Sequence, residues 1–556
     1  MPDTVTRPPA ALVVLLVVGG LIAPVLYQQR RAPSQLPGAP LAAQTWPAGP
    51  AAAAPGQHWF AGEGYITPGR WPGGQLDPGA ARRTTDLYVF NPGTAMAHVG
   101  VTVFQAAVEP RTFRLDVAPD TLAVTDLATR REVRPHAVFW IVVDADRPVL
   151  PQLARSDYLP WDPVPETLEM PLPQRGPADG TFTDWVFPDG FQGGADSWTE
   201  AETISLLNPG RQLGRATLTF HFRDGRRPRA HAVRLPAGRV TTLDLAHLFR
   251  SANPARPPAI SGDYATRVVS DVPVVSQQTR RAYARGSMFP LGSKTGAPIR
   301  SAESRLAREW YYGGGWIRPL GVLPRDGFDH TWQLLFSTSV DRTGAGARLQ
   351  VYPNQATADA QPLTLPPDRA DLQWLHEDAW RGRLGVDTPW GLRLTSESPV
   401  AATVTAAEYG PWSQGLPGAM SATPLVPGPL STAWWMGIAR HGGTDTEPVE
   451  WRAAWQFFNP GQSPVRVTVR FHGIRPVPER TVVVAPGTVL RLSGDEVPGL
   501  PTGRPLMVSA VGDGPFLGHV WVRVGARGVP ITRALTSSVG LPIGLHGDAR
   551  TAAGAP

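Results

Sequence analysis

Two segments of the chain place a tryptophan, an acid, a glutamine and an arginine at matching positions. The acid follows the tryptophan by four residues, and the arginine follows the glutamine by three. The first set is Trp59, Glu63, Gln152 and Arg155, and the second is Trp185, Asp189, Gln277 and Arg280. A carboxylate and a bidentate guanidinium beside aromatic rings are suited to binding a sugar or a carboxylate. The same pair could instead pin two strands together, so these eight candidate ligand-binding residues have a structural alternative.

Two later segments keep the tryptophan but lose the polar residues. The third segment opens with Trp310, and the fourth opens with Trp434 or Trp435. The replacements are Gly314, Thr403 and Ala406 in the third segment, and His519 and Val522 in the fourth. Such losses are expected when a duplicated module loses a binding site, and also when apolar packing replaces an ion pair. Because the tryptophans persist, we expect them to lie in hydrophobic cores.

No residue pattern typical of catalysis or metal binding occurs in the sequence. It has no cysteine, no His-Glu-x-x-His motif, and no nucleophile elbow, Walker loop or dinucleotide-binding glycine pattern. His221 and His472 share a strand position that is Phe104 in the first segment, which favours packing over metal binding. A glycosidase needs two carboxylates about 5 to 10 Å apart, whereas a single acidic position recurs here. We therefore expect no enzymatic activity, no metal and no cofactor.

Two turn motifs recur along the chain and position these residues. An apolar run ends in Asn-Pro-Gly at Asn91, Asn208 and Asn459, and the third copy has Ser337 instead of the asparagine. A later proline precedes an apolar strand at Pro148, Pro273, Pro399 and Pro515, with spacings of 125, 126 and 116 residues. Alternating apolar residues after each asparagine predict half-buried strands. We therefore expect an all-β protein with four tandem antiparallel β-sandwich domains, at residues 58–173, 181–296, 306–428 and 431–545.

The composition of the 556 residues is consistent with a β fold and argues against nucleic-acid binding. At about 150 residues per domain, the length suggests three to four domains. The 58 glycines and 61 prolines disfavour a helical bundle. The net charge is +6, from 52 basic and 46 acidic residues, and Lys294 is the only lysine. Since the arginines are spread along the chain without a long run, we expect no nucleic-acid partner.

An apolar segment near the N-terminus predicts attachment to a membrane. Residues 10–27 carry no charge, follow a short N-terminal segment (1–9) that contains Arg7, and would span about 27 Å as a helix. We expect this segment to be a single transmembrane signal anchor, and a cleaved signal peptide is the alternative. Residues 28–57 form a linker rich in proline and alanine that would hold the following domains away from the membrane, outside the cytoplasm. Residues 546–556 are a short tail.

The second segment also resembles a known family. It contains Trp185-Val-Phe-Pro-Asp-Gly-Phe191, then Glu202-Thr-Ile-Ser-Leu-Leu-Asn208, then a stretch from Ser270 through Pro273 to Arg280. This order and spacing are similar to the sensory rhodopsin transducer family, which are small bacterial β-sandwich proteins. The first segment fits the same pattern, and the resemblance extends more weakly over four copies to about residue 541. Similar motifs also recur in a wider group of secreted bacterial tandem-repeat proteins.

The resemblance implies a binding module for small molecules, sugars or protein partners. Members with a single module assemble as tetramers, so four copies in one chain could form a pseudo-tetrameric ring or remain a string of domains. We expect a membrane-anchored, non-catalytic binding or sensing protein at the cell surface that recognises a glycan, a small ligand or a protein partner. The alternative is a structural or adhesive surface protein whose repeats are spacers. The photoreceptor-linked role of the family is not transferred, because this chain has its own predicted anchor.

Overall fold

The structure is a computed structural model. It describes residues 56–67, 82–158, 162, 164–171, 173–175, 183–195, 198–248, 262–284, 290–296, 299–300, 307–316, 330–337, 344–353, 359–367, 369–375, 383–384, 388–409, 417–443, 448–473, 477–528 and 532–543. The expected anchor at 10–27 and the tail at 546–556 lie outside the described residues. Within the described residues, no helix is long and apolar enough to cross a membrane. Residues 48–556 form one compact unit.

The described chain is built from strands, which confirms the all-β fold class. The first group of elements is β1 (Gly56–Gly64), β2 (Arg82–Asn91), β3 (Ala97–Gln105), β4 (Arg111–Val117), β5 (Thr121–Asp126), the 3-10 helix η3 (Leu127–Thr129), β6 (Phe139–Tyr158), β7 (Pro165–Glu169) and β8 (Gln174–Arg175). The second group is β9 (Asp184–Gln192), β10 (Gly194–Ala195), β11 (Trp198–Asn208), β12 (Gly214–Phe222), β13 (Arg229–Leu235), β14 (Arg239–Asp244), α2 (Leu245–Leu248), β15 (Gly262–Ser270), β16 (Val275–Ala284), β17 (Pro290–Gly296) and β18 (Ile299–Arg300).

The remaining strands fall into two similar groups. The third is β19 (Ala307–Trp316), β20 (His330–Ser337), β21 (Ala345–Pro353), β22 (Asp359–Leu365), β23 (Ala370–Trp374), β24 (Pro389–Tyr409), β25 (Pro417–Pro424) and β26 (Val426–Pro427). The fourth is β27 (Ala433–Arg440), β28 (Val449–Asn459), β29 (Val465–His472), β30 (Arg480–Val484), β31 (Thr488–Ser493), the 3-10 helix η4 (Gly494–Glu496), β32 (Pro505–Gly512), β33 (Leu517–Ala526), β34 (Ala534–Val539) and β35 (Leu541–Pro542). We call the groups sheet pairs 1 to 4 because each forms two antiparallel sheets.

The strand order is the same in all four sheet pairs. The first sheets follow the orders β4-β3-β6-β1-β8, β13-β12-β15-β9-β18, β22-β21-β24-β19-β26 and β30-β29-β32-β27-β35. The second sheets follow the orders β5-β2-β6-β7, β14-β11-β16-β17, β23-β20-β24-β25 and β31-β28-β33-β34. The long strands β6 and β24 belong to both sheets, whereas pairs 2 and 4 divide this strand in two. In pair 2 the two sheets share one core, in which Phe187 of β9 packs with Ile204 of β11 and Val275 of β16.

The opening tryptophans and the late prolines are joined by a hydrogen bond. The indole nitrogen of Trp185 donates to the carbonyl of Val274, directly after Pro273, at 3.1 Å. The same bond joins Trp310 to Val400 and Trp434 to Phe516. The bond identifies Trp434, rather than Trp435, as the counterpart in pair 4. The four tryptophans, Trp59 included, are at most 2% exposed, as expected for core residues.

The asparagine of each Asn-Pro-Gly turn is buried and fully bonded. The Asn91 amide donates to the carbonyls of Ala95 and Val117, and its oxygen accepts from the Gly93 amide. Asn208 and Asn459 make the same three bonds. The side chain thus closes the turn and ties it to the end of the neighbouring hairpin, a geometry that asparagine supports.

The glycine after the acidic position faces an aromatic ring across the sheet. Gly64 is opposite Phe139, Gly190 is opposite Tyr264, and Gly315 is opposite Trp390. A Cβ atom at these glycines would lie 2.2, 2.3 and 2.0 Å from the facing ring. In pair 4 the same position is Ala439 and its cross-strand partner is Leu506, which is not aromatic. The absence of a side chain at this glycine therefore leaves space for the aromatic ring, which packs against the backbone next to the acid.

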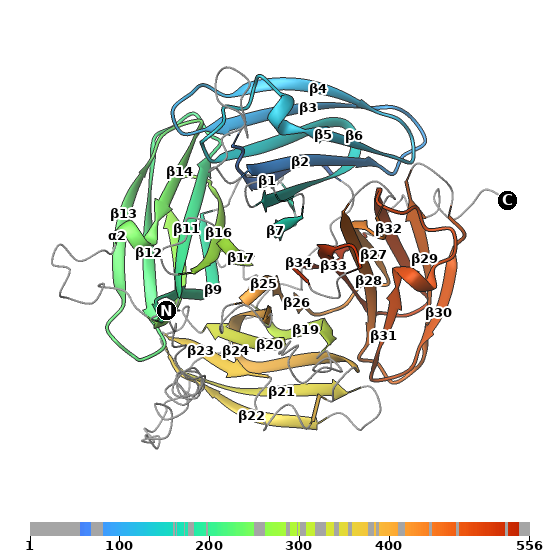
Figure 1. Ribbon diagram of the computed structural model, residues 1–556. Coiled ribbons are helices and arrows are strands. Elements are labelled where there is room, and N and C mark those ends of the chain that lie inside the picture. Colours follow the sequence, from blue (N-terminus) through green and yellow to red (C-terminus); the bar gives the residue numbers. More distant parts are fainter. Residues whose placement is uncertain are drawn as a thin grey trace, which may run out of the picture. The chain divides into compact units, whose positions relative to one another are not determined.

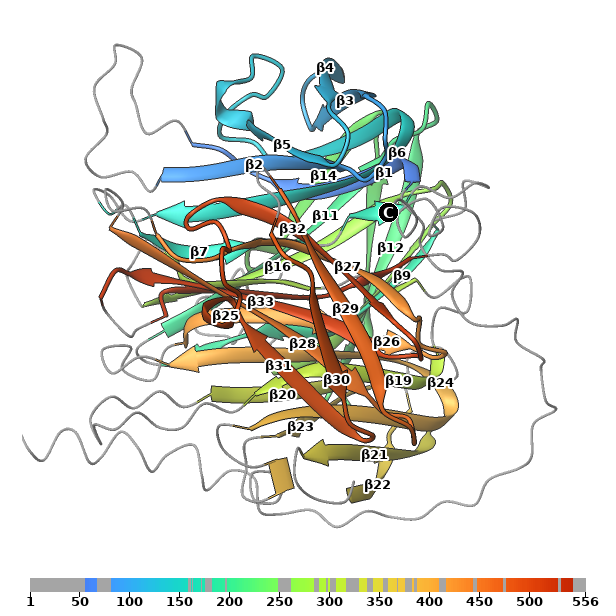
Figure 2. The ribbon, with the colours of Figure 1, turned by 90° about the vertical axis from the view of Figure 1, so that its right-hand side faces the viewer.

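The four sheet pairs contact one another in a closed series, 1 to 2, 2 to 3, 3 to 4 and 4 to 1 (Figure 1). Hydrogen bonds cross every junction, among them Trp140 to Ser205, Thr405 to Asp189, Trp521 to the Gly314 carbonyl, and the Ile438 amide to Gln152. Strands β7, β17, β25 and β34 meet at the centre. Figure 2 shows strands of pair 4, in orange and red, between those of pairs 1 and 3.

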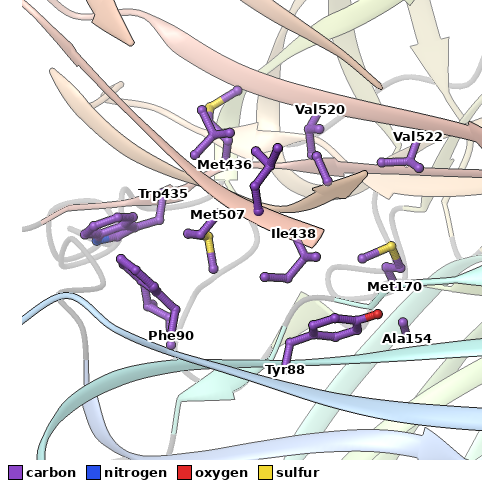
Figure 3. Close-up of a cluster of buried hydrophobic side chains, with 14 of the residues drawn as sticks. Tyr88, Phe90, Ala154, Met170, Trp435, Met436, Ile438, Met507, Val520 and Val522 are labelled. Carbon is purple, nitrogen blue, oxygen red and sulfur yellow. The ribbon is translucent and has the colours of Figure 1, made fainter. Parts of the chain in front are cut away.

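The junction of pairs 4 and 1 is a continuous hydrophobic core (Figure 3). Its labelled side chains are Tyr88, Phe90, Ala154 and Met170 from pair 1, and Trp435, Met436, Ile438, Met507, Val520 and Val522 from pair 4. The ring of His472 lies 5.1 Å from Phe90 and 5.4 Å from Trp435, and it pairs with Asp120 at 2.8 Å. The first and last sheet pairs are therefore joined by burial of apolar surface as well as by polar contacts.

We expect Gly190→Ala to lower the free energy of unfolding by about 1 to 3 kcal/mol, because the added methyl overlaps the Tyr264 ring. Gly100→Ala is the matched control, since a Cβ there would have its nearest neighbour at 3.7 Å. The measurement is urea unfolding of both variants beside the parent chain. Equal effects of the two substitutions would contradict the steric explanation.

Candidate functional site

The acid and the arginine of the first predicted set form a buried ion pair. Arg155 Nη1 lies 3.3 Å from Glu63 Oε1 and also donates to the Glu63 carbonyl at 3.2 Å. The other end of the guanidinium pairs with Glu169, on the adjacent strand β7. All three side chains are at most 3% exposed. One arginine therefore lies between two carboxylates at the end of the pair 1 core.

Sheet pair 2 contributes a second arginine to this cluster. Arg281 Nε lies 3.6 Å from Asp157 Oδ2, and Arg281 Nη2 lies 3.9 Å from Glu169 Oε1. Arg83 Nε lies 3.5 Å from the other Asp157 oxygen. The junction cluster, defined as Glu63, Arg83, Arg155, Asp157, Glu169 and Arg281, contains three acids and three arginines. Its formal charge is therefore zero.

Several buried polar atoms at this junction have no hydrogen-bond partner among the described residues. They are Glu63 Oε2, both carboxylate oxygens of Asp157, Gln174 Oε1, Thr203 Oγ1, Gln277 Nε2 and Thr279 Oγ1. Thr203, Gln277 and Thr279 share the face of the second sheet of pair 2 from which Ser205 contacts pair 1 and Arg281 reaches the cluster. Native proteins leave few buried polar groups unbonded, and such groups usually bind water or a ligand.

The acid and the arginine of the second predicted set also pair. Arg280 Nη1 lies 3.3 Å from Asp189 Oδ1, and the guanidinium lies 5.8 Å from the centre of the Phe191 ring. The hydroxyl of Thr405, from pair 3, donates to the other Asp189 oxygen. This second cluster thus also contacts the next sheet pair, pair 3. At this contact the Thr405 hydroxyl is hydrogen-bonded to Asp189.

Glu202 is a buried carboxyl beside Arg280. One of its oxygens accepts from the Phe191 amide at 3.0 Å, and the other accepts from Gln278 Nε2 at 2.6 Å. The side chain has no exposed surface, and this burial raises the pKa of Glu202 to about 7, against the opposing charge of Arg280. Burial also holds the pKa of the neighbouring Tyr264 well above its ordinary range. Glu202 therefore exchanges its proton near neutral pH.

His519 takes the place of the glutamine in pair 4. Its ring has no exposed surface and lies between Tyr312 of pair 3 and Trp521, with centroid distances of 5.2 and 5.4 Å. Burial lowers the pKa of His519 to about 3, so the imidazole is neutral at physiological pH. A Cβ atom on Gly314 would lie 2.4 Å from the ring. The acidic position of pair 3 is thus covered by an apolar contact from pair 4.

The structure brings together part of each predicted set. The acids and arginines pair, whereas Trp59 and Trp185 lie in the hydrophobic cores. Each glutamine lies on the opposite face of its strand from the arginine, because the two are three residues apart. Gln152 accepts from the Ile438 amide of pair 4 at 2.8 Å and donates to the Met170 carbonyl at 3.1 Å. Each glutamine therefore faces a neighbouring sheet pair rather than the acid of its own set.

Sequence reasoning missed several members of the two clusters. They are Glu169, Asp157, Arg83 and Arg281 in the first, and Glu202, Gln278 and Thr405 in the second. The sequence offered a reason to select two of these residues. Glu202 belongs to the family-like motif that ends at Asn208, and Arg281 directly follows the predicted residue Arg280. Glu169 and Thr405 had none, because their partners are distant in sequence. Within the described ranges, no three histidine or acidic side chains are arranged to hold a metal ion.

Comparison with known proteins agrees with the resemblance for one part of the chain. Residues 180–291 match the family described as ASRT, Anabaena sensory rhodopsin transducer. This confirms the expected transducer-like, β-sandwich resemblance for these residues, which include the second predicted set. For the other three sheet pairs the resemblance stays a prediction. No curated protein matches the chain.

Two solved structures show similarity to part of the chain. The crystal structure of Thermotoga maritima 1070 is 21% identical, covers 21% of this chain and 93% of its own, and has a TM-score of 0.18. The Anabaena sensory rhodopsin transducer is 22% identical, covers 17% of this chain and 85% of its own, and has a TM-score of 0.15.

The pKa of Glu202 leads to a pH dependence of stability. Between pH 4.5, the ordinary pKa, and about 7, the folded chain holds a proton that the unfolded chain has lost. The contribution of the protonated Glu202 to the free energy of unfolding is therefore fully present below pH 4.5. This contribution, about 3 kcal/mol, is lost as the pH rises to about 7. We expect Glu202→Gln to lack this loss, so its stability relative to the parent rises from pH 5 to pH 8.

His519 acts in the opposite direction, since its folded pKa lies below the ordinary 6.5 and stability falls as the pH drops below that value. The comparison therefore uses the difference between Glu202→Gln and the parent at each pH, in which the His519 contribution cancels. Urea unfolding at several pH values measures it. A difference that is independent of pH would show that Glu202 is not protonated in the folded chain near neutral pH.

Proposed function

We propose that this chain is a non-catalytic binding protein that holds a neutral, polyhydroxylated small molecule, a sugar or a related polyol, where sheet pairs 1 and 2 meet. The observation that carries the proposal is the group of buried polar atoms at that junction that make no hydrogen bond, from Glu63 and the ion-paired Asp157 on one side and from Gln277 and Thr279 on the other. The match of residues 180–291 to a transducer family supports a sensory rather than a catalytic module.

The chemistry of these atoms favours a neutral ligand with many hydroxyl groups. Glu63 Oε2 and the two Asp157 oxygens accept hydrogen bonds, Gln277 Nε2 donates them, and the Thr203 and Thr279 hydroxyls do both. A sugar hydroxyl both donates and accepts, so one ring can serve all three kinds of partner. The junction cluster has equal numbers of acids and arginines, so a charged ligand would leave an unbalanced buried charge.

Among the described residues, no other junction shows this combination of carboxylate, amide and hydroxyl atoms without a hydrogen bond. At the junction of pairs 2 and 3, Thr405 donates to Asp189, and at the junction of pairs 4 and 1 the Gln152 side chain uses its oxygen and its nitrogen. At the junction of pairs 3 and 4, the His519 ring covers Gly314. The contrast supports a single ligand site between pairs 1 and 2.

We further propose that the four sheet pairs are divergent copies of one transducer-like module, and that the chain is a single-chain counterpart of a four-module assembly. The shared strand order, the recurring tryptophan–carbonyl bond and the closed series of junctions support this. In such an assembly one ligand at one junction alters the contact between two modules. A ligand-dependent change of that kind is what a sensing protein passes to a partner.

We also propose that residues 10–27 anchor the chain in a membrane and that the sheet pairs lie outside the cytoplasm. The support is the uncharged apolar sequence and the proline-rich linker after it. Fusions of alkaline phosphatase and of a cytoplasmic fluorescent reporter after Pro556 are the test. We expect phosphatase activity, retained in the membrane fraction. A fluorescent fusion recovered in the soluble fraction would contradict the anchor.

Two threonines at corresponding positions provide the ligand test. Thr279 and Thr405 each stand six residues after the late proline of their sheet pair, and the Thr279 hydroxyl is unbonded whereas that of Thr405 donates to Asp189. The probes are glucose, galactose, maltose and cellobiose, with glucuronate as the charged comparison. Binding to the full chain, kept in a detergent that contains no sugar, is measured by calorimetry and thermal shift.

We expect at least one neutral sugar to bind more tightly than glucuronate, and Thr279→Val to weaken that binding about fivefold without loss of stability. Thr405→Val should leave the affinity unchanged and lower the unfolding free energy by about 1 to 3 kcal/mol, because it leaves Asp189 without its hydroxyl donor. If no neutral sugar binds, or if both variants bind equally well, the junction residues hold the sheet pairs together without a ligand. That outcome would favour the structural or adhesive alternative.

A further inference from the structure

The hairpin formed by β12 and β13 in sheet pair 2 is strongly basic. Residues 211–239 contain eight arginines and one acid, Asp224. The corresponding hairpin of pair 1, residues 94–122, contains two arginines and three acids. Arginines occur along the whole sequence, but they are denser in this hairpin than in its counterpart in pair 1. Figure 1 shows β12 and β13 at the outer edge, away from the central strands.

Most of these arginines have no acidic partner among the described residues. Arg223, Arg226 and Arg239 pair with Asp263, Asp224 and Glu109. The exposed arginines outside any described ion pair are Arg211, Arg215, Arg227, Arg229 and Arg234. A further arginine comes from pair 3, because the guanidinium of Arg369 lies beside the backbone of Gly225 at the hairpin turn. Arg229 is opposite the buried Phe220 and so lies on the other face of the hairpin, and the remaining five residues define the basic face.

Two arginines of the basic face stand directly opposite each other. Arg215 and Arg234 are cross-strand partners, and like charges in that arrangement destabilise a sheet. The corresponding position in pair 1 holds His98 opposite Asp116, with 2.8 Å between the ring nitrogen and the carboxylate. In pair 4 it holds Arg466 opposite Val483. In sheet pair 2, neither arginine has an opposite charge or an apolar side chain as its cross-strand partner.

Apolar side chains are exposed within the same surface. Leu213 is 56% exposed directly before β12, and Val269 of β15 is 43% exposed opposite Thr217 of β12. The nearby acids are Asp271, which accepts from the Arg215 amide, and Asp184, which pairs with Arg267. Arginines around exposed leucine and valine are typical of proteins that lie on a lipid surface, where the guanidinium binds phosphate and the apolar group enters the interface.

We propose that the basic face binds the phosphate headgroups of an anionic lipid bilayer. The partner is a lipid surface rather than a soluble polyanion, because Leu213 and Val269 would remain exposed against a polyanion. Residues 28–55, which precede β1, can extend to at most about 100 Å, which allows a chain held by residues 10–27 to turn this face toward the membrane. This site is separate from the proposed sugar site and does not depend on it.

The experiment measures binding of the full chain, held in phosphatidylcholine nanodiscs, to large vesicles by flotation. One set of vesicles is phosphatidylcholine, and the other contains phosphatidylglycerol at three lipids in ten. The test variant is Arg215→Gln with Arg234→Gln. The matched control is Arg114→Gln with Arg466→Gln, which removes the same charge from exposed positions of pairs 1 and 4.

We expect binding to the phosphatidylglycerol vesicles, weakened about 30-fold in the test variant at about 0.1 M salt, since each arginine near an anionic surface contributes roughly fivefold. The control variant should bind like the parent. Equal binding to both kinds of vesicle, or equal loss in the two variants, would overturn the proposal. Binding to soluble dextran sulfate without binding to vesicles would also overturn it, and would assign the face to a polyanion.

Discussion

The hydrogen bond from a buried indole to the carbonyl after the late proline fixes the geometry of the candidate site. It joins the first strand of a sheet pair to the point where the chain passes into the second sheet, and it is present for Trp185, Trp310 and Trp434. The acidic position lies four residues beyond the tryptophan, and the arginine position lies seven residues beyond the proline. With both ends held in this way, the acid and the arginine meet at the end of the core, as Asp189 and Arg280 do.

The acidic position, four residues after the tryptophan, makes different contacts in each sheet pair. Glu63 and Asp189 pair with arginines, Gly314 lies beneath the His519 ring, and the Ile438 amide donates to Gln152. In every case the position contacts its own core and lies at a junction with the next sheet pair. An acid at this position brings a charge to the junction between two sheet pairs, and an apolar residue allows hydrophobic contact at that junction.

Two parts of sheet pair 2 have opposite electrostatic character. Its interior end buries Glu202, Asp189 and Arg280, where burial dominates and raises the pKa of Glu202. Its outer hairpin exposes Arg215 and Arg234 without acidic partners in the described structure. The interior charges are held by hydrogen bonds and an ion pair within the fold, while the exterior charges can act over a longer range.

The sequence by itself determined the strands, the turns and the acid–arginine pairs. Alternation along residues 99–103, the Asn-Pro-Gly turn at Asn91 and the spacing from Trp185 to Asp189 are local features, and local chemistry was enough to interpret them. Only the tertiary structure decided that Glu169, Arg281 and Thr405 join the clusters, and that Gln152 bonds to pair 4. Those contacts join residues of different strands or sheet pairs, and no spacing in the sequence specifies which module lies beside which. Burial, which shifts the pKa values of Glu202 and His519, likewise exists only once the sheet pairs have closed on one another.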